Sequence, residues 1–179
     1  MNKKIAKSLT AKYCIRFATN HPDGDEYDGI VIHKTNTLVF ISVVDDFEVD
    51  GMLVLPRKRI AKVRDSEYEE CENRIIRGNS EIRKVKTPKW LNNIKTMKDY
   101  IKYLLKRKIW PIVEMIDSDN NNSLYIGPLI SAGNTSFTIN CYDATGEWEQ
   151  EYTLPYSEIF KVEIDSKYAN HFNSYMKGT

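Results

Sequence analysis

The sequence contains two similar halves, offset by 98 to 100 residues. Three groups of residues occur twice in the same order: Gly29, Asn36-Thr37 and Ile41 with Gly127, Asn134-Thr135 and Ile139; Leu55-Pro56, Ile60 and Val63 with Leu154-Pro155, Ile159 and Val162; and Asp65-Ser66-Glu67-Tyr68 with Asp165-Ser166-Lys167-Tyr168. Small changes of offset between the groups are what duplication followed by loop insertions would leave. The pattern predicts two copies of one supersecondary unit, and each copy can be interpreted against the other.

Length and composition limit the class of protein. A chain of 179 residues with two copies has room for two small domains, and a hydrophobic content of 41% is sufficient for packed cores. The three cysteines show no CxxC or CxxH spacing, so we expect neither a disulfide framework nor a zinc site. The basic start lacks the apolar stretch of a signal peptide, and no segment is apolar enough for a transmembrane helix. We therefore expect a cytoplasmic protein that does not interact with a membrane.

Charge is distributed unevenly along the chain, although the net charge is only +1. Residues 74–108 contain 12 basic and 2 acidic residues, which gives +10. Residues 1–73 contain 11 basic and 13 acidic residues, which gives −2, and residues 109–179 contain 3 and 10, which gives −7. The sequence thus places a basic segment between two acidic modules.

Periodicity and turn residues predict a series of strands followed by one helix in each copy. In the first copy we expect strands at 12–18, 27–34, 37–44, 48–55 and 59–64, and a helix at 66–77 with Tyr68, Cys71 and Ile75 on its packed face. In the second copy we expect strands at 109–116, 123–131, 135–143, 147–154 and 158–164, and a helix at 166–177 with Tyr168, Phe172 and Tyr175 on its packed face. A capping box at Thr96-Met97-Lys98-Asp99 predicts a further helix at 96–106.

The fourth strand of the first copy resembles a signature segment of Sm-like proteins. The segment runs from Val49 through Gly51 to Pro56 and Arg57, with Ile60 three positions later. Like the family segment, it has a glycine, an aliphatic strand, an arginine in the turn and a short last strand, although Lys58 stands where the family has glycine. The resemblance covers about a third of one copy.

We predict a mainly β protein with a few helices: two tandem five-stranded Sm/SH3-like barrels, each followed by a short helix and joined by a basic linker and helix. The expected domains are residues 1–78 for the first barrel and its helix, 79–108 for the linker, and 109–179 for the second barrel and its helix.

Comparison of the two copies predicts an apolar patch in the first copy only. Phe137, Ile139 and Cys141 alternate with polar residues and should face inward, as should Trp148, Tyr152 and Leu154 on the next strand. The inward residues of the first copy are then Val39, Ile41 and Val43. Four apolar residues remain on the outward face of the first copy: Leu38, Phe40, Met52 and Val54. We expect the 96–106 helix or the second barrel to cover this patch, and the alternative is a partner protein or a second copy of the chain.

The basic residues form a candidate nucleic-acid surface. In Sm-like proteins the arginine of the last turn helps to hold RNA, and the resemblance transfers that role to Arg57 alone. Its neighbours and three lysines spaced four apart on the 96–106 helix extend the basic surface: Lys58, Arg59, Lys98, Lys102 and Lys106. The alternative is that the basic residues form a solvent-exposed segment whose positive charge offsets the negative charge of the two acidic barrels.

Other polar groups do not form a recognisable motif. The loop Asp117-Ser118-Asp119 resembles the start of a calcium loop but lacks its glycine and its closing glutamate, so we expect an ordinary polar loop. The histidines His21, His33 and His171 lie far apart in the sequence, without cysteine or carboxylate partners at ligand spacing, and His171 is expected to be at least partly buried. We predict no catalytic residues, no metal and no cofactor.

These observations favour a non-catalytic binding module. We expect a protein-interaction adaptor with a protein partner or self-association, and the alternative is an RNA-binding Sm-like protein that uses the basic turn and the linker helix.

Overall fold

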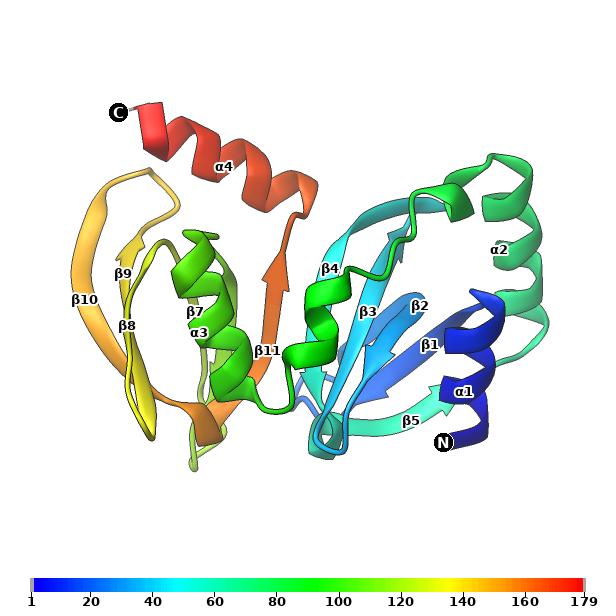
Figure 1. Cartoon of the computed structure of the whole chain (residues 1–179), viewed down its shortest axis with the longest axis horizontal. Coiled ribbons are helices and arrows are strands. Elements are labelled where there is room, and N and C mark those ends of the chain that lie inside the picture. Colours follow the sequence, from blue (N-terminus) through cyan, green and yellow to red (C-terminus); the bar gives the residue numbers. More distant parts are fainter. Residues whose placement is uncertain (1, 179) are drawn as a thin grey trace. The chain divides into compact units, whose positions relative to one another are not determined.

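The computed structural model describes residues 2–178, and the chain divides into two compact units, residues 1–92 and 93–179 (Figure 1). Among the described residues each unit is mainly β structure with two α-helices, which confirms the predicted class. The expected linker is divided between the units, because its first part belongs to the first unit and its helix to the second.

The first unit contains an open antiparallel sheet with the strand order β5-β1-β2-β3-β4. Its elements are α1 (Asn2–Ala11), β1 (Cys14–Thr19), β2 (Glu26–Lys34), β3 (Leu38–Asp45), β4 (Glu48–Pro56), the 3-10 turn η1 (Arg57–Arg59), β5 (Ile60–Arg64), α2 (Glu67–Gly78) and the 3-10 turn η2 (Glu81–Arg83). Each predicted strand and the predicted helix begin and end within two residues of the observed bounds. Within the described part of the unit, β4 and β5 do not pair with each other, so the expected closed barrel is not observed.

The second unit contains two three-stranded antiparallel sheets, with the orders β11-β6-β7 and β10-β9-β8. Its elements are α3 (Met97–Arg107), β6 (Ile112–Ile116), β7 (Asn122–Ile126), β8 (Leu129–Ala132), β9 (Ser136–Tyr142), β10 (Trp148–Pro155), the 3-10 turn η4 (Tyr156–Glu158), β11 (Ile159–Ile164) and α4 (Lys167–Gly178); the 3-10 turn η3 (Lys89–Asn93) precedes it. The single strand predicted at 123–131 is interrupted at Gly127 and Pro128, which separates β7 from β8. The described residues of this unit therefore form six strands and no closed five-stranded barrel.

Glycine recurs where the second strand of each copy approaches the third. A Cβ atom on Gly29 would lie 2.4 Å from Ile41 Cγ2 and 2.7 Å from the carbonyl oxygen of Ser42. A Cβ atom on Gly127, whose φ is +150°, would lie 2.0 Å from the carbonyl oxygen of Asn140. Because only glycine permits so close a backbone approach, both copies need it at this position.

The main core of the first unit lies on the inner face of the sheet and beneath α1. It comprises Ile5, Ile15, Phe17, Val31, Val39, Ile41, Leu53, Leu55, Ile60 and Val63. The predicted inward residues Val39 and Ile41 belong to this core, and Val43 packs at its margin. This part of the prediction is confirmed.

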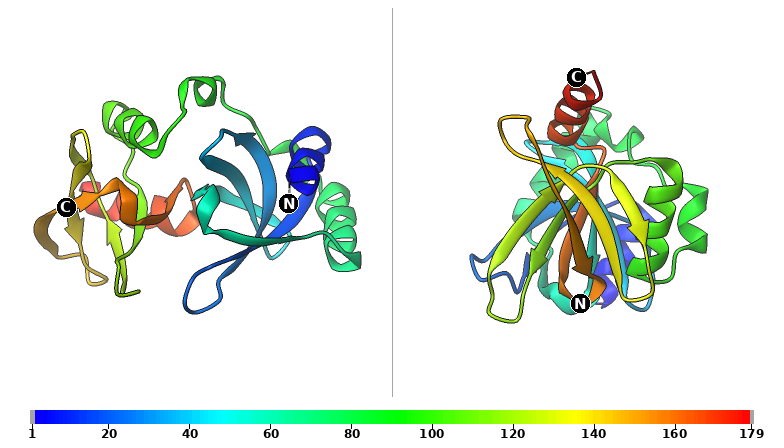
Figure 2. Two further views of the ribbon diagram at one scale, coloured as in Figure 1. Left: turned by 90° about the horizontal axis from the view of Figure 1, so that it is seen from below. Right: turned by 90° about the vertical axis from the view of Figure 1, so that its left-hand side faces the viewer.

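Helix α1 precedes the first predicted strand and was not predicted. Its Ile5 is 1% exposed in the core, and the hydroxyl of its buried Ser8 accepts a hydrogen bond of 2.8 Å from the backbone N–H of Val31. Arg77 of α2 donates to the carbonyl of Ala11 at the end of α1 (2.9 Å). Figures 1 and 2 show α1 and α2 beside the β1–β5 part of the sheet. The apolar spacing of Ile5 and Leu9 was the sequence signal for this helix.

Helix α3 agrees with the predicted capping box. The Thr96 hydroxyl accepts from the backbone N–H of Asp99 (3.2 Å), and the Asp99 carboxylate accepts from the backbone N–H of Thr96 (2.9 Å). The helix begins and ends one residue later than predicted.

The trailing helices α2 and α4 do not bury the predicted faces. Their buried residues are Glu69, Asn73 and Ile76 in α2, and Ala169, Asn173 and Met176 in α4. Tyr68, Tyr168 and Tyr175 of the predicted faces are 78%, 54% and 58% exposed. Cys71 and His171 are exposed too, so the expected burial of His171 was wrong. Hydropathy periodicity failed because an asparagine lies at the centre of each buried face.

Both asparagines bind the backbone at the start of the first strand of their copy. The Asn73 carboxamide accepts from the N–H of Cys14 (2.8 Å) and donates to the carbonyl of Cys14 (2.9 Å). Asn173 donates to the carbonyl of Trp110 (3.2 Å) and accepts from the Tyr142 hydroxyl (2.6 Å). Asn73 thus satisfies two buried backbone groups of Cys14, and Asn173 satisfies the part-buried carbonyl of Trp110. Cys14 and Trp110 are therefore equivalent positions.

The inward face of β9 is as predicted, but the prediction for Trp148 was wrong. Phe137, Ile139 and Cys141 are at most 2% exposed, whereas Trp148 is 47% exposed. Trp148 pairs with Tyr142, and the pairing of β9 and β10 is irregular between Trp148 and Glu151. The extra residue in β10 moves Trp148 to the opposite face, a change that strand alternation alone does not reveal.

Candidate functional site

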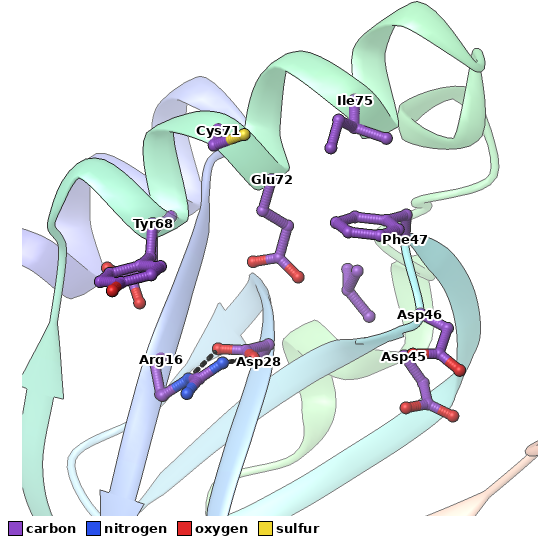
Figure 3. Close-up of a pocket in the computed structure, with 11 residues that line it drawn as sticks. Arg16, Asp28, Asp45, Asp46, Phe47, Tyr68, Cys71, Glu72 and Ile75 are labelled. Atoms are coloured by element: carbon purple, nitrogen blue, oxygen red, sulfur yellow. Dashed lines mark hydrogen bonds and ion pairs between the residues drawn. The ribbon is translucent and has the colours of Figure 1, made fainter.

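A cavity of about 360 Å³ opens in the first unit between α2 and the hairpin that joins β3 to β4 (Figure 3). Its lining consists of Arg16, Asp28, Val44, Asp45, Asp46, Phe47, Tyr68, Glu69, Cys71, Glu72 and Ile75. We call this cavity the charged pocket. One arginine and five carboxylates line it, which gives a net charge of −4 when all are ionised.

The floor of the charged pocket is an ion pair between neighbouring strands. Arg16 of β1 lies opposite Asp28 of β2 in the strand register. Its Nε donates to Asp28 Oδ1 (2.7 Å) and its Nη2 donates to Asp28 Oδ2, so the pair is bidentate. Nη1 also donates to Glu26 (3.3 Å). These bonds occupy the Arg16 guanidinium and stabilise its charge, which raises its pKa.

Glu72 projects from α2 into the charged pocket, above the Arg16–Asp28 pair (Figure 3). Its Oε2 accepts a hydrogen bond from the Cys14 thiol (3.2 Å). Burial raises the pKa of Glu72, and the nearby Asp28 carboxylate acts in the same direction. Burial also raises the pKa of the Cys14 thiol, and Glu72 adds to this effect, so Cys14 remains a neutral donor.

Glu69 is held at the base of α2. It accepts from Arg64 Nε (2.8 Å) and from the backbone N–H and the hydroxyl of Ser66 (2.7 Å each). Burial acts to raise the pKa of Glu69, but the hydrogen bonds from Ser66 and Arg64 outweigh it and lower the pKa. Glu69 therefore forms the capping box that begins α2 and is not available to a ligand.

The rim of the charged pocket carries an exposed aromatic ring on a tight turn. Asp46 and Phe47 connect β3 to β4, and both have a positive φ, 44° and 67°. Phenylalanine rarely adopts this left-handed conformation. In Phe47 it places the side chain, which is 43% exposed, at the pocket. Tyr68 lies at the opposite side, with the Arg64 guanidinium 5.6 Å from its ring centroid.

In the second unit, the residues equivalent to the lining of the charged pocket form a layer beneath the trailing helix α4. The asparagine contacts align Cys14 with Trp110, and the strand pairs Phe17–Val63 and Val113–Val162 agree with that alignment. The equivalents of five pocket residues follow: Arg16, Asp28, Val44, Glu69 and Glu72 correspond to Ile112, Ile126, Tyr142, Ala169 and Phe172.

In the second unit this layer is an apolar core. Ile112, Ile126, Tyr142, Ala169 and Met176 are buried together, with Trp110 and Phe172 packed against them. The ring centroids of Phe172 and Tyr142 lie 5.0 Å apart, and those of Tyr142 and Trp148 lie 5.8 Å apart. The same structural layer is thus filled with apolar and aromatic side chains in one copy and lined by charged groups around a cavity in the other.

This arrangement suits the binding of a positively charged group. The charged pocket offers carboxylate oxygens beside an apolar wall formed by Val44, Phe47 and Ile75. Neither the sequence motifs nor the strand register indicated the charged pocket, because its residues come from four separate segments. A comparison of the two copies was the available signal, because Glu72 aligns with Phe172 in the sequence itself.

Comparison of the chain with protein-family models, with curated proteins and with solved structures found no match. The resemblance to Sm-like proteins therefore stays a prediction. Among the described residues, no helix combines the length and the apolar character that crossing a membrane requires.

The predicted apolar patch is not a free surface in this structure. Leu38, Phe40, Met52 and Val54 are at most 7% exposed, and Phe40 pairs with Val54 across β3 and β4 as expected. The segment after α2 crosses the same unit: the Thr87 hydroxyl donates to the carbonyl of Ile32 in β2 (3.2 Å). Their role as an interface stays a prediction, and we do not place the site there.

The predicted basic residues belong to separate units. Arg57, Lys58 and Arg59 form the 3-10 turn η1 of the first unit, where Lys58 is exposed and the arginines are half-buried. Lys98, Lys102 and Lys106 lie on α3 of the second unit. Lys98 donates to Asn134 Oδ1 (3.0 Å), while Lys102 and Lys106 are exposed. Their contact with nucleic acid is untested.

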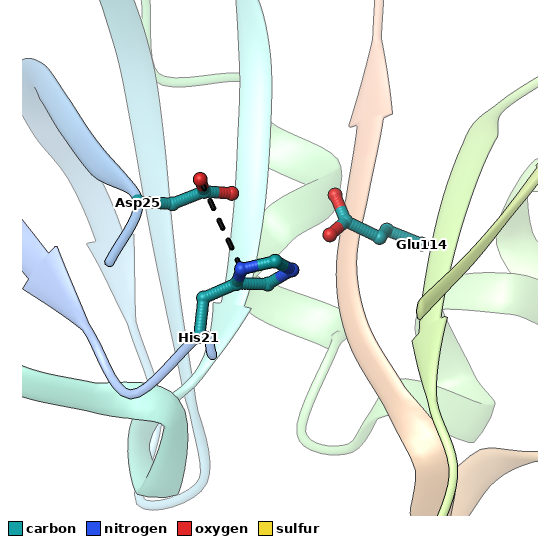
Figure 4. Close-up of side chains that lie close together, drawn as sticks. All are labelled: His21, Asp25 and Glu114. Atoms are coloured by element: carbon teal, nitrogen blue, oxygen red, sulfur yellow. Dashed lines mark ion pairs between the residues drawn. The ribbon is translucent and has the colours of Figure 1, made fainter. Parts of the chain in front are cut away.

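His21 has nearby carboxylates that sequence spacing did not emphasise. Its Nδ1 lies 3.7 Å from Asp23 Oδ2 and 3.9 Å from Asp25 Oδ1 (Figure 4), and it accepts a hydrogen bond from the backbone N–H of Asp23 (3.0 Å). This group organises the turn between β1 and β2. Glu114, also drawn in Figure 4, forms an ion pair with Lys161 (2.8 Å) inside the second unit.

Proposed function

We propose that this protein is a non-catalytic protein-interaction module and that the charged pocket of its first unit binds the partner. The observation behind this proposal is the difference between the two copies. One copy fills the layer beneath its trailing helix with an apolar core, and the other copy opens that layer into a pocket lined by charged groups.

The energetics of the layer support a binding role. Moving charged groups out of water costs several kcal/mol each, and replacing a buried ion pair with apolar side chains is often neutral or stabilising by about 1 to 4 kcal/mol. The second unit demonstrates that this arrangement of strands and helix accepts an apolar layer. An apolar layer is thus compatible with this kind of unit, which favours a role in recognition for Arg16, Asp28 and Glu72.

The chemistry of the charged pocket favours binding over catalysis. The Cys14 thiol, which donates to Glu72, is buried and has a raised pKa, which opposes formation of the thiolate that a nucleophile needs. Arg16 is bound to two carboxylates. The pairing of β5 with β1 and the close approach of β3 to Gly29 support an open Sm/SH3-like arrangement as the scaffold.

Capture of partners by the tagged full chain tests the proposal. We expect a protein to co-purify with the wild type and to be lost with Glu72→Phe, which places the residue of the second copy in the pocket. The matched control is Glu70→Phe, an equal substitution at an exposed position of the same helix, which should retain the partner.

Two results would contradict the proposal. One is a partner that binds the wild type and Glu72→Phe equally. The other is nuclease-sensitive nucleic acid as the bound species, released steeply between low and moderate salt, since that behaviour belongs to the RNA-binding alternative.

A further inference from the structure

We propose that the charged pocket binds an arginine side chain of the partner, with the guanidinium against Glu72 and the hairpin carboxylates. This inference rests on the proposed function, because it names the chemical group that the same site takes.

Charge is the first argument. The pocket lining contains five carboxylates and one arginine, and Arg16 donates its hydrogen bonds to Asp28 and Glu26. The attraction of Arg16 for Glu72 is smaller than the repulsion between Asp28 and Glu72. Within the described residues, the bond that Glu72 accepts comes from the Cys14 thiol, a weak and neutral donor. A cation entering the pocket would give Glu72 a charged donor in a partly desolvated place, where such a bond is strongest.

Size is the second argument. Pockets for drug-sized ligands and cofactors usually measure about 300 to 1,000 Å³. At about 360 Å³ the charged pocket lies at the lower end, which suits one long side chain with its flanking backbone better than a nucleotide cofactor.

The apolar part of the pocket distinguishes a guanidinium from other cations. Phe47 is 43% exposed at the rim, and Val44 and Ile75 continue the apolar wall. A planar, weakly hydrated guanidinium stacks on an aromatic face and pairs with a carboxylate through two N–H groups, whereas an ammonium acts as a point charge. The same unit already places Arg64 over the ring of Tyr68 (5.6 Å). A divalent metal would bind the carboxylate oxygens and would gain no stabilisation from the apolar wall.

The second unit provides an internal comparison. Phe172 and Tyr142 occupy the positions of Glu72 and Val44, so the equivalent layer contains neither the carboxylate nor the space. We therefore expect one arginine site per chain, in the first unit.

The test is a titration of the ¹⁵N-labelled full chain with N-acetyl-arginine amide, followed by NMR. We expect saturable shifts of the amides of Asp28, Phe47 and Glu72, with a Kd on the order of 1 mM for one bidentate pair and one ring contact. The citrulline analogue, which has the same shape without charge, should bind at least tenfold more weakly, and the lysine analogue should bind more weakly than arginine.

Two variants locate the binding. Glu72→Gln should weaken arginine binding about tenfold, the scale of one lost charge-assisted contact. Glu70→Gln, with the same change of charge on the exposed face of α2, should leave it unchanged.

Three results would overturn the inference: no saturable shift with the arginine probe, equal binding of arginine and citrulline, or the same shifts produced by calcium chloride alone at lower concentration. Loss of the captured partner in Glu72→Phe together with any of these results would refute the arginine inference and leave the proposed function standing. Retention of that partner would refute the proposed function itself.

Discussion

Replacing Glu72 with phenylalanine should stabilise the first unit while it closes the charged pocket. Glu72 is half-buried, and its pKa is raised because burial disfavours its charged form. Phe172 occupies the equivalent position of the second copy, where its ring lies 5.0 Å from that of Tyr142. The substitution thus reproduces an arrangement that the other unit already contains.

The expected gain follows from the surroundings of Glu72. Full burial of a phenylalanine side chain contributes about 1.5 to 3 kcal/mol. Apolar groups, among them Val44 and Ile75, form only part of the pocket wall, so about half of that value is realistic. The Cys14 thiol loses its acceptor, which offsets a small part of the gain because a thiol is a weak donor. We expect a net increase of about 1 kcal/mol in the free energy of unfolding.

Urea denaturation and calorimetry measure this gain. An increase of about 1 kcal/mol should raise the Tm by about 4 to 8 °C if the first unit unfolds separately, or by about 2 to 4 °C if the whole chain unfolds together. Glu70→Phe, the exposed control, should stay within about 0.5 kcal/mol of the wild type. A loss of stability in Glu72→Phe beyond that of the control would refute the reasoning, because it would mean that the charged layer itself supports the fold.

Three further predictions follow from the same region. Because the pKa of Glu72 is raised in the folded state, the contribution of Glu72 to stability is fully present below about pH 4.5 and is lost as the pH rises through the folded-state pKa. In urea titrations, the free energy of unfolding of Glu72→Gln relative to wild type should therefore increase from about pH 4.5 towards neutrality. A constant difference between the two proteins would contradict this. Asn73→Ala should lose about 2 to 4 kcal/mol, because it leaves the N–H and carbonyl of Cys14 without partners, whereas the exposed Asn79→Ala should change little; equal effects would exclude a special role for Asn73. A thiol reagent should modify Cys71 alone in the folded protein and all three cysteines in denaturant, and modification of a second thiol before unfolding would contradict the assigned burial.

Local signals in the sequence were sufficient for most elements. The strands of the first copy and the capping box at Thr96 depend on neighbouring residues, so periodicity and turn chemistry located them within two residues. Sequence reasoning failed where a contact between distant segments decides the outcome. Asn73 and Asn173 are buried because each binds backbone from the start of a strand, and this reversed the expected packing face of both trailing helices.

The candidate site could not be predicted from the sequence, because it too depends on contacts between distant segments. Arg16, Asp28, Phe47 and Glu72 lie in four separate segments, and no spacing rule relates them. The alignment of Glu72 with Phe172 was visible, but its meaning depended on knowing that the layer beneath α2 is packed in one copy and open in the other.

The sequence by itself determined that this chain contains two copies of a mainly β unit, since repeated glycines, turns and caps act through local geometry. The tertiary structure alone decided which residues of those copies face each other. Side-chain burial, hydrogen bonds to distant backbone and the bulge that turns Trp148 outward arise only when the strands and helices pack. The duplication therefore sets a shared arrangement, and the packing beneath α2 and α4 determines that one copy has a core where the other has a charged pocket.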